Sequence, residues 1–294
     1  MTPLIFPLPG NEATAQALVT ALDAEMGALE TRHFPDGESY VRFLTPVDGR
    51  RVILVCTLDR PDARIMPLIF AASGAGELGA KEVGLVVPYL AYMRQDTRFH
   101  PGEVVTSTHF AGLLNRCIDW LITIDPHLHR RKSLSEIYDM PTRVLQAAPA
   151  IAAWIKSSVD KPVLVGPDAE SEQWVHAVAD LAGAPFLVLE KTRHGDRDVE
   201  VTVPQVEQWQ DHTPVLVDDI ISTARTMIET VNHLTGTAMP APVCIGVHAV
   251  FAGGAYQDLQ DAGTTRIVTC NTIPHESNGI DLTSLLVDGV REMF

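Results

Sequence analysis

The residues best suited to chemistry lie in the stretch PVLVDDIISTARTM, which covers positions 214–227. A run of apolar and β-branched residues, typical of a buried strand, ends at two adjacent carboxylates, Asp218 and Asp219. Hydroxyl-bearing and small residues follow, and a helical pattern then begins. The start of a helix offers backbone N–H groups and a positive dipole end to a phosphate. The carboxylates beside it can accept from vicinal hydroxyls or hold a divalent cation through water. The segment therefore predicts a site for a phosphorylated sugar.

The loop of this candidate site runs from Ser222 to Thr226. Ser222 or Thr223 is the expected N-cap of the following helix, because a hydroxyl at that position accepts from an unpaired backbone N–H group. A simpler interpretation stays open at this point, in which the segment is only a capped helix start with a solvated acid pair.

Short apolar runs rich in β-branched residues recur along the chain and predict strands. Most are continuous rather than alternating, which is typical of strands covered on both faces. Helix-like segments fall between them, so the alternation predicts an α/β protein with mainly parallel sheets and right-handed crossovers. The expected strands are 51–58, 82–90, 119–125, 162–167, 185–191, 214–221, 242–251 and 266–273, and the expected helices include 60–80, 106–118, 169–183 and 222–235.

The chain of 294 residues is long enough for two domains. A polar stretch with prolines near 139–161 separates two α/β halves of similar length. We therefore expect an N-terminal domain at 1–145 and a C-terminal domain at 146–294 that carries the sugar-phosphate loop. This division allows the last residues of the second domain to pack back on the first domain.

The net charge of −15, from 22 basic and 37 acidic residues, argues against a nucleic-acid partner, which needs a contiguous basic face. It does not exclude small phosphorylated substrates, because a few cations and oriented N–H groups suffice for them. Residues 1–10 lack the features of a signal peptide, and no apolar run approaches the roughly 20 residues of a membrane span. We expect a cytoplasmic protein without a membrane partner.

The four cysteines are far apart in the sequence and form no C-x-x-C pair. We expect buried, reduced thiols rather than metal ligands. They are Cys56, Cys117, Cys244 and Cys270.

Charged residues at the ends of the other predicted strands are further candidates, because ligands of open α/β sheets bind at the carboxyl ends of the strands. These candidates are Arg94–Asp96, Asp125–His129, Asp168 and Lys191–Arg193.

Two other motifs are weaker. GAGELG at 74–79 matches a dinucleotide-binding pattern, but it closes a helical segment instead of following a strand, so it predicts a helix C-terminus and a loop. HLH at 127–129 could place two imidazoles on one side of a strand. Without a matching cluster a structural zinc is not expected, while an acid–base or positioning role stays open.

Six segments, taken in order, resemble ribose-phosphate diphosphokinases, also called phosphoribosyl diphosphate synthetases. VLVDDIISTART alone resembles the phosphoribosyl-diphosphate loop shared by type I phosphoribosyltransferases, and the other five narrow the resemblance. They are FPDGESYVRF (34–43), VVPYLAYMRQDTRFHPGE (86–103), TIDPHLH (123–129), VGPDAES (165–171) and LEKTRHGDRDVEV (189–201). The resemblance implies two similar phosphoribosyltransferase-like domains with mainly parallel sheets.

The resemblance also implies a reaction. The anomeric hydroxyl of ribose 5-phosphate attacks the β-phosphorus of ATP, diphosphate moves to the sugar and AMP leaves, with Mg²⁺ bridging the phosphates. Catalysis of this kind depends mainly on alignment and charge neutralisation. The family further implies a homo-oligomer in which a neighbouring subunit completes the nucleotide site.

The resemblance assigns roles to individual residues. Lys191 and Arg193 would cover the phosphates from a loop, His127 would position Mg-ATP as a catalytic residue and metal ligand, and Asp168 would bind Mg²⁺. The simpler alternatives are a solvated loop, a capping histidine and a Pro-Asp turn.

Two further sets complete the implied site. Phe34, Asp36 and Glu38 would recognise adenine, and Arg94, Gln95 and Asp96 would hold the nucleotide; the simpler alternatives are a hairpin turn and an exposed turn. The ribose 5-phosphate set comprises Asp218, Asp219, Ser222, Thr223, Ala224, Arg225 and Thr226.

The chain departs from the family at two positions of the sugar-phosphate loop. Most members carry a third acid where this chain has Ser222, and a glycine where it has Arg225. If that glycine serves a positive φ or a close backbone approach, arginine would hinder binding. Two alternatives therefore stay open, a phosphoribosyltransferase that consumes the activated sugar and a non-catalytic or regulatory paralogue.

Overall fold

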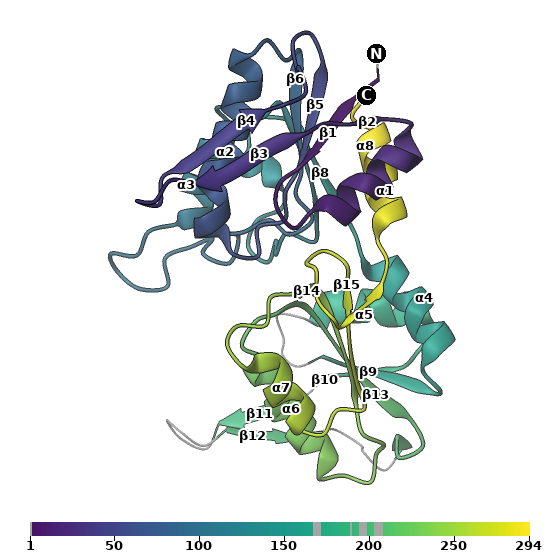
Figure 1. The fold of residues 1–294 in the computed structure, drawn as a ribbon. Helices are drawn as coiled ribbons and strands as arrows, with labels where there is room; N and C mark the ends of the chain where they lie inside the picture. The colour runs from purple at the N-terminus through teal and green to yellow at the C-terminus, as the bar shows by residue number, and fades with distance from the viewer. Residues whose placement is uncertain (1, 167–171, 189, 194–198, 203–207) are drawn as a thin grey trace. The chain divides into compact units, whose positions relative to one another are not determined.

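The computed structural model describes residues 2–166, 172–188, 190–193, 199–202 and 208–294 (Figure 1). The chain divides into two compact units. The first comprises Met1–Leu145 together with Thr283–Phe294, and the second comprises Gln146–Leu282. The C-terminal residues thus belong to the same unit as the N-terminus.

The first unit contains a six-stranded sheet in the order β2-β1-β5-β6-β7-β8, and all its strands are parallel. Its core strands are continuous apolar runs that are buried on both faces, as the sequence predicted. Their bounds are β1 (Leu4–Pro7), β2 (Glu25–Met26), β5 (Arg51–Val55), β6 (Glu82–Val86), β7 (Trp120–Ile124) and β8 (Thr142–Leu145).

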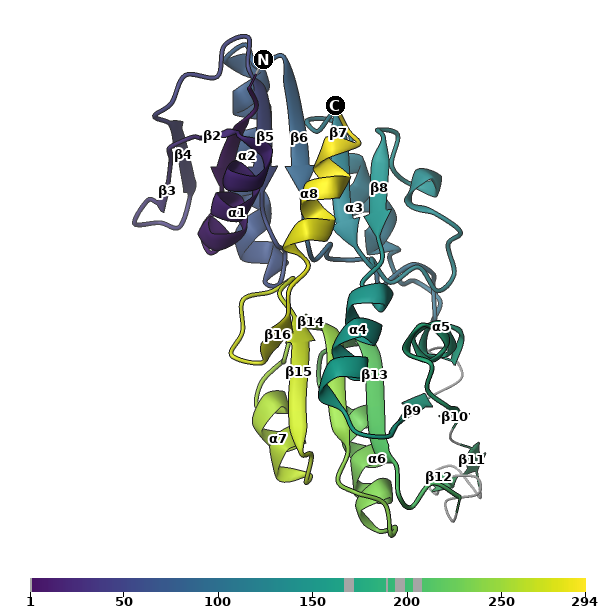
Figure 2. The same ribbon diagram turned by 90° about the vertical axis from the view of Figure 1, so that its right-hand side faces the viewer.

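Helices cover both faces of this sheet (Figure 2). α1 (Glu12–Leu22) and α8 (Thr283–Arg291) pack together on one face, and α2 (Pro61–Glu77) and α3 (Thr106–Leu114) lie on the other. The short 3₁₀ turn η1 spans Leu134–Glu136.

The C-terminal segment is anchored at several points. Arg143 of β8 pairs with Glu292 at 2.8 Å, Arg291 donates to the Ala21 carbonyl at 3.0 Å, and Phe294 meets the Trp120 ring edge-on. These contacts tie α8 to the sheet and to α1.

A hairpin of two antiparallel strands, β3 (Leu29–His33) and β4 (Ser39–Phe43), projects from the first unit. Its base is fixed because the Phe43 ring packs edge-on against the buried Phe6 at 4.9 Å. Its tip, residues 34–38, is exposed, and Gly37 supplies the positive φ of the turn.

The second unit repeats the parallel α/β plan in the order β10-β9-β13-β14-β15-β16. α4 (Ala148–Ser158) and α5 (Glu172–Ala182) pack together on one face of this sheet, and α6 (Arg225–Thr235) and α7 (Ala255–Asp261) pack together on the other (Figure 1). The strands are β9 (Pro162–Gly166), β10 (Phe186–Val188), β13 (Thr213–Ile221), β14 (Val243–Ala249), β15 (Arg266–Cys270) and β16 (Asn278–Ile280). A separate antiparallel hairpin joins β11 (Glu190–Arg193) and β12 (Val199–Thr202).

The α/β architecture with parallel sheets confirms the fold class predicted from the sequence. Two local expectations were wrong. Residues 139–161 are not only a separator but hold β8 and α4, and the single strand expected at 185–191 is divided between β10 and β11. The glycine motif at 74–79 does close a helix, since α2 ends at Glu77 and Gly79 has a φ of 88°.

All four cysteines are free, and Cys56, Cys244 and Cys270 are buried. Burial raises the pKa of the Cys56 thiol to about 12, so it stays protonated. In the described ranges, every helix is too short or too polar to cross a membrane.

Candidate functional site

The acid pair lies near the C-terminal end of strand β13 in the second unit. Asp218 pairs with Gly246 of β14, and both carboxylate residues are half-buried. The Asp219 N–H group donates to the Asp218 carboxylate at 2.9 Å. The strand continues to Ile221, so the acids stand at the carboxyl edge of the sheet where a ligand of this fold class binds.

The loop after β13 turns at Ala224, which has a left-handed backbone with φ of 56°. Ala224 is the N-cap of α6, and no side chain caps this helix start. The expectation that Ser222 or Thr223 is the N-cap was therefore wrong. The chain reaches the helix through a left-handed residue, and this places the two hydroxyl residues before the cap.

This geometry bears on the expected effect of Arg225 on binding. It is the first residue of α6, its backbone is right-handed helical and its side chain is exposed. The residue that carries the strained backbone is Ala224, so an arginine at position 225 has no unfavourable φ to bear. The expected hindrance from a positive φ does not arise at this residue.

In the first unit, Gln95 and Asp96 hold the loop after β6. The Gln95 amide donates to the Thr97 carbonyl and to the Glu103 carboxylate, each at 3.2 Å. The Asp96 side chain is 2% exposed and pairs with Arg130 at 3.3 Å. Arg94, in contrast, is exposed. Of this candidate set, Arg94 is the side chain most open to a ligand.

Glu103 organises the same loop and was not singled out from the sequence. Its carboxylate accepts from the backbone N–H groups of Phe99 at 2.7 Å and His100 at 3.1 Å, in addition to Gln95. A carboxylate that follows a Pro-Gly turn is a signal for such local capping.

Phe34, Asp36 and Glu38 lie at the exposed tip of the β3–β4 hairpin. The Asp36 carboxylate accepts from the Glu38 N–H group at 3.2 Å, so this acid shapes the turn. The guanidinium of Arg32 stands 4.7 Å from the centre of the Phe34 ring and 4.1 Å from that of Tyr40. Sequence reasoning missed Arg32 and Tyr40, whose contact with Phe34 depends on the register of the hairpin.

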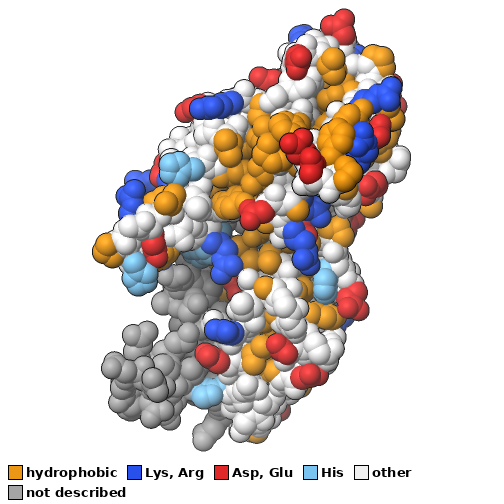
Figure 3. All heavy atoms as spheres, turned by 60° about the vertical axis from the view of Figure 1, so that its left-hand side comes forward, with side chains coloured by type: hydrophobic (Ala, Val, Ile, Leu, Met, Phe, Trp, Pro, Cys, Tyr) orange, Lys and Arg blue, Asp and Glu red, His pale blue; other side chains and the backbone are white. Residues whose placement is uncertain are grey.

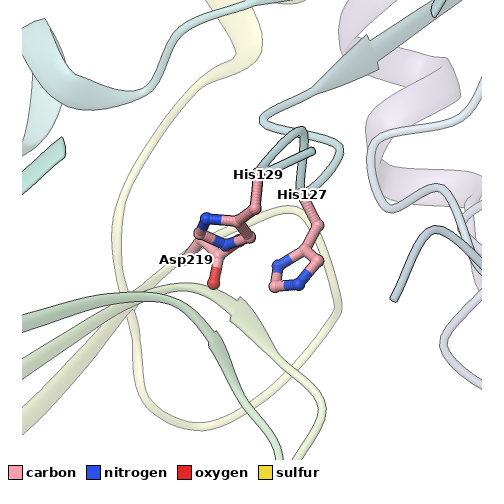
Figure 4. A group of neighbouring side chains, drawn as sticks. All are labelled: His127, His129 and Asp219. Atoms are coloured by element: carbon pink, nitrogen blue, oxygen red, sulfur yellow. The ribbon is translucent and has the colours of Figure 1, made fainter. Parts of the chain in front are cut away.

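His127 and His129 lie in the loop that follows β7 (Figure 4). Their rings meet edge-to-face with centroids 4.1 Å apart. Asp125 and His127 both have positive φ, of 35° and 56°. Non-glycine residues in this conformation cost of order 1–3 kcal/mol each and concentrate at ligand sites. The loop is thus a non-strand conformation rather than the alternating strand that the HLH spacing suggested.

The remaining candidates are only partly described. Lys191 and Arg193 lie in β11, where the backbone of Lys191 pairs with that of Val201 and the backbone of Arg193 with that of Val199. Asp168 lies outside the described residues.

Comparison with known proteins identifies the two parts of the chain. Residues 4–117 match the N-terminal domain of ribose phosphate pyrophosphokinase, and residues 133–285 match the phosphoribosyl transferase domain. Pyrophosphokinase is a synonym of diphosphokinase, so these matches confirm the resemblance read from the motifs.

Relatives align over nearly the whole chain, and a solved structure superimposes on all of it. A ribose-phosphate pyrophosphokinase of Methanobrevibacter smithii is 31% identical and aligns over 96% of this chain and 98% of its own length. That of Methanothermobacter thermautotrophicus is 30% identical over 98% and 100%. The crystal structure of phosphoribosylpyrophosphate synthetase from Mycobacterium smegmatis, 23% identical, superimposes with a TM-score of 0.88 over 100% of this chain and 99% of that one, which confirms the phosphoribosyltransferase-like fold. The chain belongs to the ribose-phosphate pyrophosphokinase family.

Proposed function

We propose that the protein is an ATP-dependent ribose-phosphate diphosphokinase. It transfers the β- and γ-phosphoryl groups of ATP to the 1-hydroxyl of ribose 5-phosphate, and the products are 5-phosphoribosyl 1-diphosphate and AMP. The observation that carries the proposal is the match of relatives with this name over almost the entire length of both chains.

The sugar site is the loop between β13 and α6. Asp218 and Asp219 accept hydrogen bonds from the ribose hydroxyls. The 5-phosphate binds at the start of α6, whose first N–H groups have no side-chain cap in the described structure. The hydroxyls of Ser222, Thr223 and Thr226 add donors for the phosphate oxygens.

The chemistry is a displacement at the β-phosphorus. The sugar O1 forms a bond to this phosphorus, and the bond from it to the bridging oxygen of AMP breaks. Lys191 and Arg193 neutralise the charge that develops on the transferred group, while Arg94 holds the nucleotide phosphates. Such reactions need cations and alignment more than covalent catalysis.

Mg²⁺ is the cofactor that this reaction requires. Mg²⁺ favours oxygen ligands and is usually held by one or two carboxylates together with substrate phosphates and water. The proposal takes His127, an imidazole from a loop with a constrained backbone, as one ligand. The proposal also keeps Asp168 as a ligand. When bound, Mg²⁺ neutralises the triphosphate.

The nucleotide site is completed by a second subunit of a homo-oligomer. The hairpin tip with Phe34 is exposed, as a segment that reaches into a partner must be. Apolar side chains also gather on the surface of the first unit (Figure 3). Met66 and Phe70, one turn apart on α2, are more than two-fifths exposed, and such patches are typical of protein–protein contacts. We place the enzyme in the cytoplasm, where its thiols stay reduced.

AMP formation from ATP and Mg²⁺ tests the proposal when it is measured with and without ribose 5-phosphate. We expect sugar-dependent AMP from the wild type and a loss of at least about 100-fold in Lys191→Ala, which removes a transition-state charge. The control Lys156→Ala, at an exposed residue of α4, should lose no activity. ATP binding without AMP formation from folded protein would contradict the proposal and favour a regulatory paralogue.

A further inference from the structure

Three aromatic rings from separate segments of the second unit pack around one another beside the sugar-phosphate loop. Phe251 follows β14, Tyr256 belongs to α7 and His275 lies between β15 and β16. The ring centroids of Phe251 and His275 are 4.7 Å apart, those of Tyr256 and His275 4.7 Å, and those of Phe251 and Tyr256 5.1 Å. We call these three residues the aromatic cluster.

The cluster is connected to the loop through the backbone of Phe251 and Ala252. The Phe251 N–H group donates to the Ile221 carbonyl at 2.9 Å, and the Ala252 N–H group donates to the Ser222 carbonyl at 3.0 Å. The ladder between β13 and β14 ends at the pair Ile221 and Ala249. These two bonds therefore continue the backbone hydrogen bonding from the sheet into the start of the sugar-phosphate loop.

Phe251 makes the first of these bonds from a strained conformation. Its φ is 36°, a left-handed value that a bulky residue rarely adopts. Such a backbone persists only when its surroundings fix it. Phe251 is buried, at 9% exposed, and the rings of Tyr256 and His275 pack against its ring.

His275 is itself held in one orientation. Its Nδ1 atom accepts from the Ser277 N–H group at 3.1 Å and lies 2.8 Å from the Ser277 hydroxyl. That hydroxyl is 2.8 Å from the buried Thr269 hydroxyl of β15, and the His275 N–H group donates to Asn278 at 3.0 Å. Because Nδ1 accepts a hydrogen bond, the imidazole is neutral with its proton on Nε2.

We propose that Phe251, Tyr256 and His275 are positioning residues for ribose 5-phosphate. The aromatic cluster fixes the left-handed Phe251 backbone, whose neighbouring N–H groups fix Ile221 and Ser222. The turn at Ala224 and the phosphate-binding start of α6 are thereby held in place before the sugar arrives. This inference rests on the proposed function, because it takes the loop at 222–226 as the sugar-phosphate site.

The test removes one ring and follows sugar binding separately from stability. Tyr256→Ala opens the aromatic cluster, Tyr256→Phe keeps the ring, and Trp154→Ala removes a ring from α4 of the same unit, where Trp154 packs under Arg266. The affinity for ribose 5-phosphate is measured by calorimetry on the full chain, and KM for ATP and the thermal midpoint are measured for each variant.

We expect Tyr256→Ala to weaken ribose 5-phosphate binding by about 10- to 100-fold, the loss that follows a small misplacement of binding groups, with KM for ATP unchanged. Tyr256→Phe should restore wild-type binding, and Trp154→Ala should lower stability without weakening sugar binding. A Tyr256→Ala protein that is less stable but binds the sugar as the wild type does would overturn the inference.

Hydrogen exchange distinguishes a failure of the inference about the aromatic cluster from a failure of the proposed function. If the wild type itself does not bind ribose 5-phosphate, the proposed function and this role of the aromatic cluster both fall. Exchange at the amides of residues 222–228 should still increase in Tyr256→Ala and not in Trp154→Ala if the cluster holds the loop. Unchanged exchange there would refute the structural step of the inference, whatever the ligand.

Discussion

The guanidinium of Arg32 stands over the rings of both Phe34 and Tyr40, 4.7 Å from the first centroid and 4.1 Å from the second, and the two rings meet edge-to-face with centroids 5.9 Å apart. Arg32 and Tyr40 are a directly opposed pair in the β3–β4 hairpin, whereas Phe34 is at its exposed tip. The cation and the Tyr40 ring together hold the Phe34 ring at the tip.

Arg32→Ala should loosen Phe34 and weaken nucleotide binding. Because exposed cation–π contacts contribute about 0.5–1 kcal/mol each, KM for ATP should rise about 2- to 10-fold while KM for ribose 5-phosphate stays constant. Steady-state kinetics in both substrates checks this, with Arg42→Ala on the same hairpin as the charge-matched control. An equal effect in Arg42→Ala would mean that net charge, not ring packing, is responsible.

Ala224→Gly should stabilise the protein. A left-handed alanine costs roughly 1–2 kcal/mol that glycine avoids, and glycine loses about 0.5–1 kcal/mol in backbone entropy. The expected gain is about 0.5–1 kcal/mol in the free energy of unfolding, measured in urea. Ala153→Gly, on the exposed face of α4, is the matched control and should destabilise by about 1 kcal/mol. Two variants that change stability in the same direction would rule out strain at Ala224.

His275 should make folding sensitive to mild acid. Burial lowers the pKa of His275 below its ordinary value of 6.5, and the Glu276 carboxylate opposes this shift. The unfolded chain thus takes up a proton at a higher pH than the folded chain does, so stability falls as the pH drops from 6.5 through the folded-state pKa.

The measurement compares unfolding free energies of the wild type and His275→Gln at about pH 7.5 and about pH 5, on either side of the ordinary histidine range. The variant should lose less stability between the two than the wild type does. Equal losses would show that the other titrating groups, and not His275, set the acid sensitivity.

Gly84→Ala should be strongly destabilising. A Cβ atom at this β6 position would come within 2.0 Å of the Trp120 ring on the neighbouring strand β7. Overpacking of this kind costs typically about 1–3 kcal/mol. Gly112→Ala is the control, because a Cβ there meets no atom within 4 Å and the residue lies in α3. We expect this control to gain roughly 0.5–1 kcal/mol in urea unfolding, since alanine suits a helix better than glycine.

The sequence predicted those parts of the site that depend on residue type and on one strand. Asp218 and Asp219 could be placed at a strand end because the apolar run before them has only one reasonable conformation. The turn at Ala224 could not be predicted, because alanine carries no signal for a left-handed backbone and serine and threonine beside it are the better caps by type.

Contacts between segments that are distant in the chain could not be predicted from the sequence either. Arg32 and Tyr40 meet Phe34 through hairpin register, and Phe251, Tyr256 and His275 come from three different connections. In such cases each residue alone has an ordinary surface or core explanation. Only the folded structure shows that these residues contact one another.

The division of the first unit has a consequence for synthesis of the chain, because α8 is translated after the whole of the second unit. Residues 146–282 are complete before α8 is translated. Until then Trp120 of β7 lacks its contact with Phe294, and Arg143 of β8 lacks its ion pair with Glu292. Domains generally fold as units during translation, starting with the N-terminal one. The two segments of the first unit are thus separated by the synthesis of the second unit, and α8 can add its contacts to β7 and β8 only after residues 146–282 have been made.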